Sequence, residues 1–323
     1  MKYVNIPDTD LRPSCLCLGS NRFGTVIDQT DAFALLDAFV EVGGNFIDTA
    51  LIYADWIPDA PKSASEKTIG QWLKRSSNRD RVVLATKGGH PDLTTMHLHR
   101  LSKTDITRDI DASLSNLQTD VIDLYWLHRD ATSVPVANLI ETLNQQVQAG
   151  KIRYFGCSNW QVERIIAAND YANKNDSQGF VASQPWWSLA QPNRGALSYS
   201  ENMVVFGSKE QAFHRQTGLA VMPYSAQARG YFSKLDKLGT IGLTETDRAS
   251  FFNETNARRW PRVKQLAEKH GVPVSHVALS YLTSQPFVVI PIIGCRTLDQ
   301  LEDSTAATNL VLTPEEITLL SEA

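Results

Sequence analysis

Long apolar runs, paired cysteine motifs and blocks of like charge are all absent from this sequence. No apolar run reaches the ~18 residues that a membrane-spanning helix needs, and residues 1–8 lack the apolar core of a signal peptide. The four cysteines, Cys15, Cys17, Cys157 and Cys295, form no CxxC motif, which favours reduced thiols. We therefore expect a cytoplasmic protein without a membrane segment.

Positive charge is not in excess either. The sequence has 31 Lys and Arg against 35 Asp and Glu, a formal net charge of -4, so neither nucleic acid nor a membrane surface is expected as a partner. With 42% hydrophobic residues the composition is that of a globular protein. A length of 323 residues allows two domains, but a barrel of this size commonly forms one. Because no linker, repeat or low-complexity segment interrupts the chain, we expect a single domain over residues 1–323.

Short β-rich apolar runs alternate with segments of helical periodicity along most of the chain. A hairpin leading into a first strand is expected in residues 2–19, and further strands at 45–50, 81–87, 121–128, 152–156, 180–184, 219–223 and 288–291. Helices are expected at residues 30–42, 65–75, 104–117, 136–149, 161–173, 208–217, 274–283, 299–307 and 314–320. Long loops are expected at residues 54–64, 190–207 and 226–261.

This alternation predicts an α/β protein with a parallel sheet, and eight units predict a (β/α)8 TIM barrel after an N-terminal β-hairpin. The long loops would build a pocket at the C-terminal face of the barrel. An open, doubly wound sheet is the alternative. No Gly-x-Gly-x-x-Gly follows the first strand, which counts against a dinucleotide-binding fold of that kind.

The predicted strand at residues 121–128 ends in a histidine. Its nearly continuous apolar sequence is typical of a strand buried on both faces. Side chains alternate along a strand, so Trp126 and His128 share one face. A titratable ring at the C-terminal tip of a barrel strand lies where barrel enzymes perform their chemistry, although His128 could simply bond a loop carbonyl. No histidine or carboxylate lies near it at metal-ligand spacing, so a metal site is not expected.

Polar residues fall at the ends of three successive predicted strands: Asp48 with Tyr53 just beyond it, then Lys87, then His128. A phenol is a poor acid because its reference pKa is ~10, and a nearby ammonium would lower that pKa. A carboxylate would hold the ammonium in place, and an imidazole would orient a carbonyl oxygen. Such a set suits proton delivery to a carbonyl as hydride arrives, or the reverse oxidation of an alcohol.

Each residue alone has a structural alternative. Asp48 could cap the segment after it, Tyr53 could be a half-buried loop aromatic, and Lys87 could reach solvent. Their joint appearance at adjacent strand ends favours a functional site.

The motifs at these positions resemble the aldo-keto reductase superfamily. They are Phe46-Ile47-Asp48-Thr49-Ala50 with Tyr53, Ala85-Thr86-Lys87, Leu127-His128 and Gly156-Cys157-Ser158-Asn159. The resemblance implies a (β/α)8 barrel that uses NADPH, or less often NADH, to reduce aldehydes and ketones. By the same motifs, Tyr53, Asp48, Lys87 and His128 would be the catalytic tetrad, with Tyr53 as general acid.

The resemblance also implies cofactor-binding positions. Ser158, Asn159 and Gln184 would bind the nicotinamide carboxamide, and Trp187, where the family usually has tyrosine, would stack on the nicotinamide ring. The loop from Tyr224 to Gly230 would approach the pyrophosphate, and the segment after the last strand would hold the adenosine phosphate. The full set is Asp48, Ser158, Asn159, Gln184, Trp187, Tyr224, Ser225, Ala226, Gln227, Ala228, Arg229, Gly294, Arg296, Gln300, Asp303 and Ser304.

The adenosine-phosphate segment departs from the family pattern. Gly294 and Gln300 stand where basic residues are common, which leaves Arg296 as the cation of the segment. A single guanidinium can still bind a 2'-phosphate bidentately. NADPH is therefore the expected cofactor, and a promiscuous or NADH-preferring site is the alternative.

The substrate pocket is specified by fewer residues. Candidates for its wall are Trp56, Trp126, Trp160 and Arg22, together with Asn21 and His90. Tryptophans in a pocket mouth suit flat carbonyl compounds, although they could equally be packing residues. The expected partner is a small carbonyl or alcohol substrate, bound by a monomer or a homo-oligomer. The alternative function is an NADPH-binding regulatory subunit with slow turnover, like the potassium-channel beta subunits that the resemblance also includes.

Overall fold

Eight parallel strands form the centre of the protein. The structure is a computed structural model that describes residues 1–193, 195 and 203–322. The strands are β1 (Cys17–Gly19), β2 (Phe46–Asp48), β3 (Val83–Gly88), β4 (Ile122–Leu127), β5 (Ile152–Ser158), β6 (Ala182–Gln184), β7 (Ala220–Val221) and β8 (Ile292–Ile293). Their order in the sheet is β7-β6-β5-β4-β3-β2-β1-β8. Val221 of β7 forms a parallel bridge with Val289, just before β8, so the sheet closes into the predicted barrel.

Alternate side chains of each strand face two different cores, as the period of two requires. One cluster fills the barrel interior with residues such as Phe46, Leu124 and Trp126, and the hairpin residues Ile6 and Leu11 join it. A larger cluster packs the other face of the strands against the helices. The polar residues at the strand ends therefore rest on a barrel that is packed with side chains rather than open.

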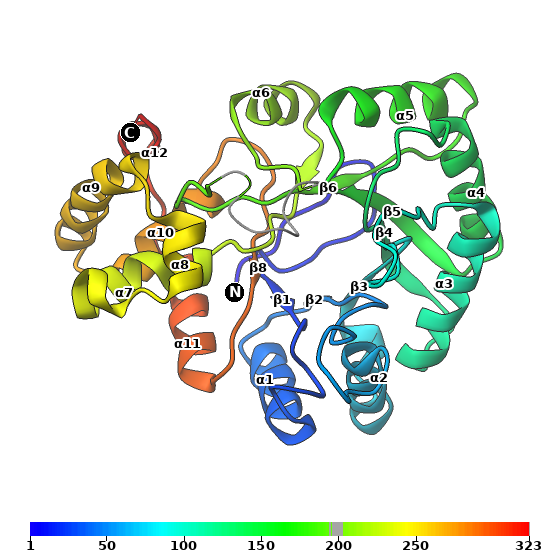
Figure 1. Ribbon diagram of the computed structural model, residues 1–323, viewed down its shortest axis with the longest axis horizontal. Coiled ribbons are helices and arrows are strands. Elements are labelled where there is room, and N and C mark those ends of the chain that lie inside the picture. The colour runs from blue at the N-terminus through cyan, green and yellow to red at the C-terminus, as the bar shows by residue number, and fades with distance from the viewer. Residues whose placement is uncertain (194, 196–202, 323) are drawn as a thin grey trace.

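Helices surround the strands (Figure 1). Nine of them lie within one residue of the predicted bounds at both ends: α1 (Gln29–Glu41), α2 (Ala64–Ser76), α3 (Lys103–Leu117), α4 (Val136–Gln148), α5 (Val162–Lys174), α6 (Ser208–Thr217), α10 (Val274–Thr283), α11 (Leu298–Ala306) and α12 (Pro314–Ser321). Polar caps fix several starts: Asp28 accepts from the amide of Asp31, and Ser102 from that of Asp105. No helix in the described ranges is long and apolar enough to cross a membrane.

Two sequence predictions about the fold need correction. The segment at 226–261 is not a loop, because it holds α7 (Tyr231–Leu238), α8 (Glu245–Phe251) and the start of α9 (Glu254–His270). The last strand lies at Ile292–Ile293 instead of 288–291, although Val289 makes the closing bridge. The predicted N-terminal hairpin is present: the amides of Val4 and Ile6 donate to the carbonyls of Pro13 and Leu11, and Tyr3 and Ser14 form an antiparallel bridge. Of the predicted loop at 190–207, residues 194 and 196–202 lie outside the described residues.

Candidate active site

Adjacent strand ends bring Asp48, Lys87 and Tyr53 into direct contact. Asp48 is the last residue of β2, Lys87 lies near the end of β3, and Tyr53 follows β2 in a series of turns. The Lys87 ammonium donates to the Asp48 carboxylate, to the Tyr53 hydroxyl at 2.9 Å and to the carbonyl of Thr49 at 2.7 Å. Gln184 Nε2 donates to the second Asp48 oxygen at 3.1 Å. The carboxylate and the phenol are thus joined through one amine.

Burial strengthens the electrostatic interaction between the Lys87 ammonium and the Asp48 carboxylate. Lys87 and Asp48 are each only 1% exposed. Burial works to lower the pKa of Lys87, but the charges of Asp48 and Tyr53 outweigh it and raise that pKa above its ordinary value. The amine therefore stays an ammonium at neutral pH.

The pKa of Tyr53 differs from the sequence-based expectation. Burial of the phenol raises its pKa, and the Lys87 ammonium offsets only part of that rise. The prediction of a net lowered pKa is therefore wrong, although the effect of Lys87 has the predicted sign. Tyr53 holds its proton at neutral pH, beside an ammonium that would stabilise the phenolate once the proton has left.

His128 completes the group from the end of β4. Its ring lies 5.9 Å from the Tyr53 ring and 4.8 Å from that of His90, between centroids. Burial lowers the pKa of His128 well below its ordinary value, with further lowering from His90 and Lys87. Burial likewise lowers the pKa of His90 to about 4. His128 is thus a neutral imidazole, and its buried Nδ1 has no hydrogen-bond partner among the described residues.

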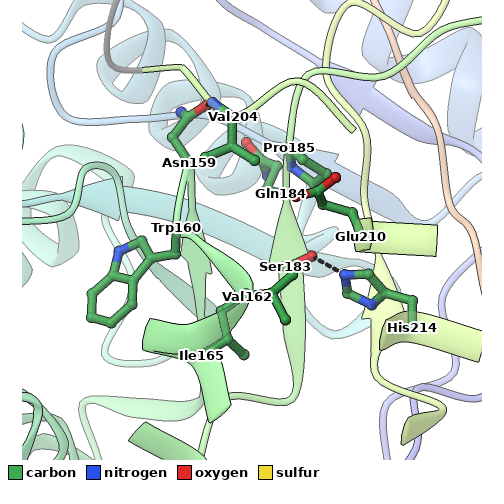
Figure 2. A pocket seen from close by; sticks show the side chains of 10 residues that line it. All are labelled: Asn159, Trp160, Val162, Ile165, Ser183, Gln184, Pro185, Val204, Glu210 and His214. Atoms are coloured by element: carbon green, nitrogen blue, oxygen red, sulfur yellow. Dashed lines mark hydrogen bonds between the residues drawn. The ribbon is translucent and has the colours of Figure 1, made fainter. Parts of the chain in front are cut away.

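Three amide and hydroxyl side chains gather at the ends of β5 and β6. Ser158 Oγ donates to the carbonyl of Gln184 at 2.9 Å, and Asn159 Nδ2 donates to Ser158 Oγ at 3.1 Å. The hydroxyl of Tyr224, which follows β7, donates to Asn159 Oδ1 at 2.7 Å. Figure 2 shows Asn159 and Gln184 at the same end of these strands. The cavity that the side chains of Figure 2 line measures about 10 Å³, room for about one water molecule, so it is too small to hold a nicotinamide ring.

The loop after β7 has an unusual backbone. Ser225, Ala228 and Arg229 all have positive φ, between 49° and 56°, although none is glycine. Such conformations are uncommon for these residues and concentrate at functional sites. Arg229 Nε donates to Asp247 at 3.0 Å, and Gln227 Nε2 donates to Ser304 Oγ at 2.9 Å. The second bond brings this loop against α11.

The residues after β8 make two kinds of contact, some within their own segment and some with a neighbouring helix. Gln300 accepts from the backbone amide of Arg296 at 2.8 Å, and a side chain at Gly294 would meet open space. Asp303 instead accepts from His276 and Ser275 of α10, at 3.1 and 3.2 Å. The contacts of Asp303 are thus with a neighbouring helix, and its cofactor role stays a prediction.

Arg22 lies with the predicted cofactor arginines. Its pKa is lowered by burial and by the positive charges of Arg296 and Arg229. These three guanidiniums form an electropositive group that we call the arginine cluster. Arg22 thus lies within electrostatic range of the predicted phosphate-binding residues, and its place in the wall of the substrate pocket stays a prediction.

The tryptophans fall in different places from those predicted. Trp187 is 6% exposed and stacks on Phe206 with 4.0 Å between ring centroids, so the prediction that it stacks on nicotinamide is wrong. Trp126 is 0% exposed inside the barrel, and Trp160 is 3% exposed, so neither forms the predicted pocket wall. Trp56 is 47% exposed, 6.0 Å from the Tyr53 ring, as a wall residue requires.

Sequence reasoning passed over two features of this site. The Thr49 carbonyl holds Lys87 through the backbone, which no residue type reveals. Arg129 is partly buried and lies within electrostatic range of Tyr53 and Tyr224. Its position immediately after His128 could have drawn notice to it.

Comparisons with known proteins extend these observations. A family model described as the aldo/keto reductase family matches residues 15–323. Norsolorinic acid reductase stcV of Emericella nidulans is 31% identical over 324 residues, which cover 96% of this chain and 78% of that protein. Oxidoreductase YrpG of Bacillus subtilis, named as uncharacterized, is 31% identical over 327 residues, which cover 100% of this chain and 95% of that protein.

A solved structure gives the same fold. The crystal structure of the thermostable aldo-keto reductase Tm1743, in complex with the inhibitor epalrestat, matches with a TM-score of 0.73 at 23% identity and covers 100% of this chain and 99% of that chain. This likeness confirms the (β/α)8 architecture. The family match over nearly the whole chain and the relatives named as reductases settle the wider question: this chain belongs to the aldo-keto reductase family of NAD(P)H-dependent reductases.

Proposed function

We propose that this protein is an NADP-dependent reductase of aldehydes or ketones, with Tyr53 as the general acid. The observation that carries the proposal is the hydrogen-bonded chain from Asp48 through the Lys87 ammonium to the Tyr53 hydroxyl. When bound, NADPH supplies the hydride, and the protein supplies position and a proton. The reverse oxidation of an alcohol would use the same groups.

The pKa of Tyr53 suits an acid that must hold its proton until a carbonyl arrives. As the proton leaves, the phenolate forms 2.9 Å from the Lys87 ammonium, which stabilises negative charge at that oxygen. Neutral His128 carries one N–H that can orient the carbonyl oxygen. The hydrogen bond from Gln184 to one oxygen of Asp48 holds the carboxylate in the orientation in which its other oxygen bonds Lys87.

The residues near β5, β6 and β7 fit a nicotinamide carboxamide. Asn159 Nδ2 gives one hydrogen to Ser158 and has a second to donate. Gln184 Oε1 accepts no hydrogen bond within the described part of the chain, whereas its Nε2 is taken by Asp48. Tyr224, partly exposed and bonded to Asn159, is the better-placed aromatic for the pyridine ring, because Trp187 is in the core.

NADPH fits the site better than NADH. In the arginine cluster, Arg229 is paired with Asp247, but Arg22 and Arg296 have no acidic partner among the described residues. A 2'-phosphate would neutralise these two guanidiniums, which bind phosphate oxygens well. The left-handed backbone at Ser225, Ala228 and Arg229 offers amide groups for the pyrophosphate. All four cysteines are free and buried, which supports a reducing compartment such as the cytoplasm.

The test is to mix the protein with NADPH and a panel of aldehydes and ketones, and to follow the near-ultraviolet absorbance of the cofactor. We expect loss of absorbance that requires both protein and carbonyl, and a weaker apparent affinity for NADH. The proposal fails if NADPH binds tightly but no carbonyl is reduced over many turnovers, which is the behaviour of a regulatory subunit. Slow product release together with a stable copurified partner would also indicate a regulatory subunit.

A further inference from the structure

Arg129 is a partly buried guanidinium beside the candidate active site that has no acidic partner among the described residues. It follows His128 directly, at the end of β4. No hydrogen bond or ion pair joins its side chain to any residue in the described part of the chain. The adjacent carboxylate, Asp130, is already taken by Arg164, whose Nη2 and Nε lie 2.9 and 3.0 Å from its two oxygens.

Arg100, like Arg164, is neutralised by a carboxylate. Arg100, on the loop before α3, donates to the buried carboxylate of Asp109. The carboxylate at the site itself, Asp48, is committed to Lys87 and Gln184. A charge taken out of water without a partner is expensive, so the lack of a partner for Arg129 in the described part of the chain requires an explanation.

The surrounding groups supply no negative charge. Tyr53 and Tyr224 are the residues whose charges interact most with Arg129, and both are phenols. The positive charge of Arg129 also lowers the pKa of His90 and of His128, after burial as the larger cause, so both imidazoles are neutral. Among the described residues near Tyr53 and His128, Lys87 is paired to Asp48, whereas the positive charge of Arg129 has no acidic partner.

We propose that Arg129 binds a carboxylate group of the carbonyl substrate, while the carbonyl lies against Tyr53 and His128. This inference rests on the proposed reductase function and adds a substrate class to it. A guanidinium binds a carboxylate through two parallel hydrogen bonds, which would fix the orientation of the substrate as well as its affinity. The exposed ring of Trp56, 6.0 Å from Tyr53, would cover one face of a flat substrate.

The experiment compares a matched pair of aldehydes, 2-carboxybenzaldehyde and its methyl ester, in wild type, Arg129→Gln and Arg129→Lys. Arg215→Gln removes the same charge from an exposed position on α6 and serves as the control. We expect Arg129→Gln to raise KM for the carboxylate by about 10- to 100-fold, the loss of a charged hydrogen bond. We expect KM for the ester and the Kd of NADPH, followed by protein fluorescence, to change less than about twofold.

Several outcomes would overturn the inference. One is an unchanged preference between carboxylate and ester in Arg129→Gln; another is an equal loss with both substrates together with weaker NADPH binding, which would assign Arg129 to the cofactor. Partial rescue by Arg129→Lys would support a role for the charge. If wild type reduces neither aldehyde, phthalate binding to the NADPH complex by calorimetry decides about the anion site, and the panel of carbonyls decides separately about the proposed function. Loss of phthalate binding in Arg129→Gln supports the anion site, and equal binding refutes it.

Discussion

The buried contact between Asp48 and Lys87 predicts strong coupling between substitutions at the two positions. Both side chains are almost fully buried, and the ammonium bonds the carboxylate directly. Lys87→Met would leave the carboxylate without its counter-ion, at a cost of about 3–5 kcal/mol in the free energy of unfolding. The cost of Asp48→Asn should lie near the lower end of that range, because the Lys87 ammonium keeps the Thr49 carbonyl and the Tyr53 hydroxyl as acceptors.

The double variant Asp48→Asn/Lys87→Met contains no stranded charge. Its loss of stability should therefore be smaller than the sum of the two single losses by about 2–3 kcal/mol. The assay is urea unfolding at neutral pH, followed by both tryptophan fluorescence and circular dichroism, whose transitions must coincide.

An exposed pair supplies the control for this cycle. Lys151 and Asp111 also form an ion pair, but their side chains are 33% and 50% exposed. The same substitutions there should couple by less than about 1 kcal/mol. If the single losses at Asp48 and Lys87 add to the double loss within about 0.5 kcal/mol, the electrostatic reasoning about the site is refuted.

Two further predictions concern buried groups away from the tetrad. Burial lowers the pKa of His214 to about 4, against ~6.5 when unfolded, so its stabilisation is complete above pH ~6.5 and declines as pH falls toward 4, by at most about 3 kcal/mol. His214→Gln should flatten this loss in urea unfolding at a series of pH values; an unchanged slope would contradict it. A Cβ at Gly156 would lie 2.5 Å from the Trp126 ring and 2.6 Å from the Ala182 carbonyl. Gly156→Ala should therefore cost about 1–3 kcal/mol, whereas Gly294→Ala, in open space, should cost little; equal costs would contradict the packing argument.

Local patterns were sufficient for most of the architecture. Nine helices and the positions of Asp48, Lys87 and His128 at strand ends follow from apolar periodicity and from turn residues such as Gly43 and Gly150. The helices within 226–261 were missed because polar residues dominate there, although Thr244 and Asp247 form a capping box that marks the start of α8.

The aromatic residues show where sequence reasoning is weakest. Trp186 and Trp187 are neighbours in sequence, and which of them faces the pocket or the core depends on the backbone path after β6. Trp187 stacks on Phe206 and Phe287, which are 19 and 100 positions away in the chain, so no local pattern predicts its burial. The pKa of Tyr53 depends in the same way on burial, a tertiary property.

The central claim is that Tyr53 donates the proton, and the variant Tyr53→Phe tests it most directly. The assay measures the Kd of NADPH by fluorescence and the turnover of an aldehyde that wild type reduces, with Tyr3→Phe, an exposed tyrosine, as control. Tyr53→Phe should bind NADPH about as well as wild type and lose turnover by about 100-fold or more. Turnover within a few-fold of wild type, with NADPH binding intact, would contradict the claim.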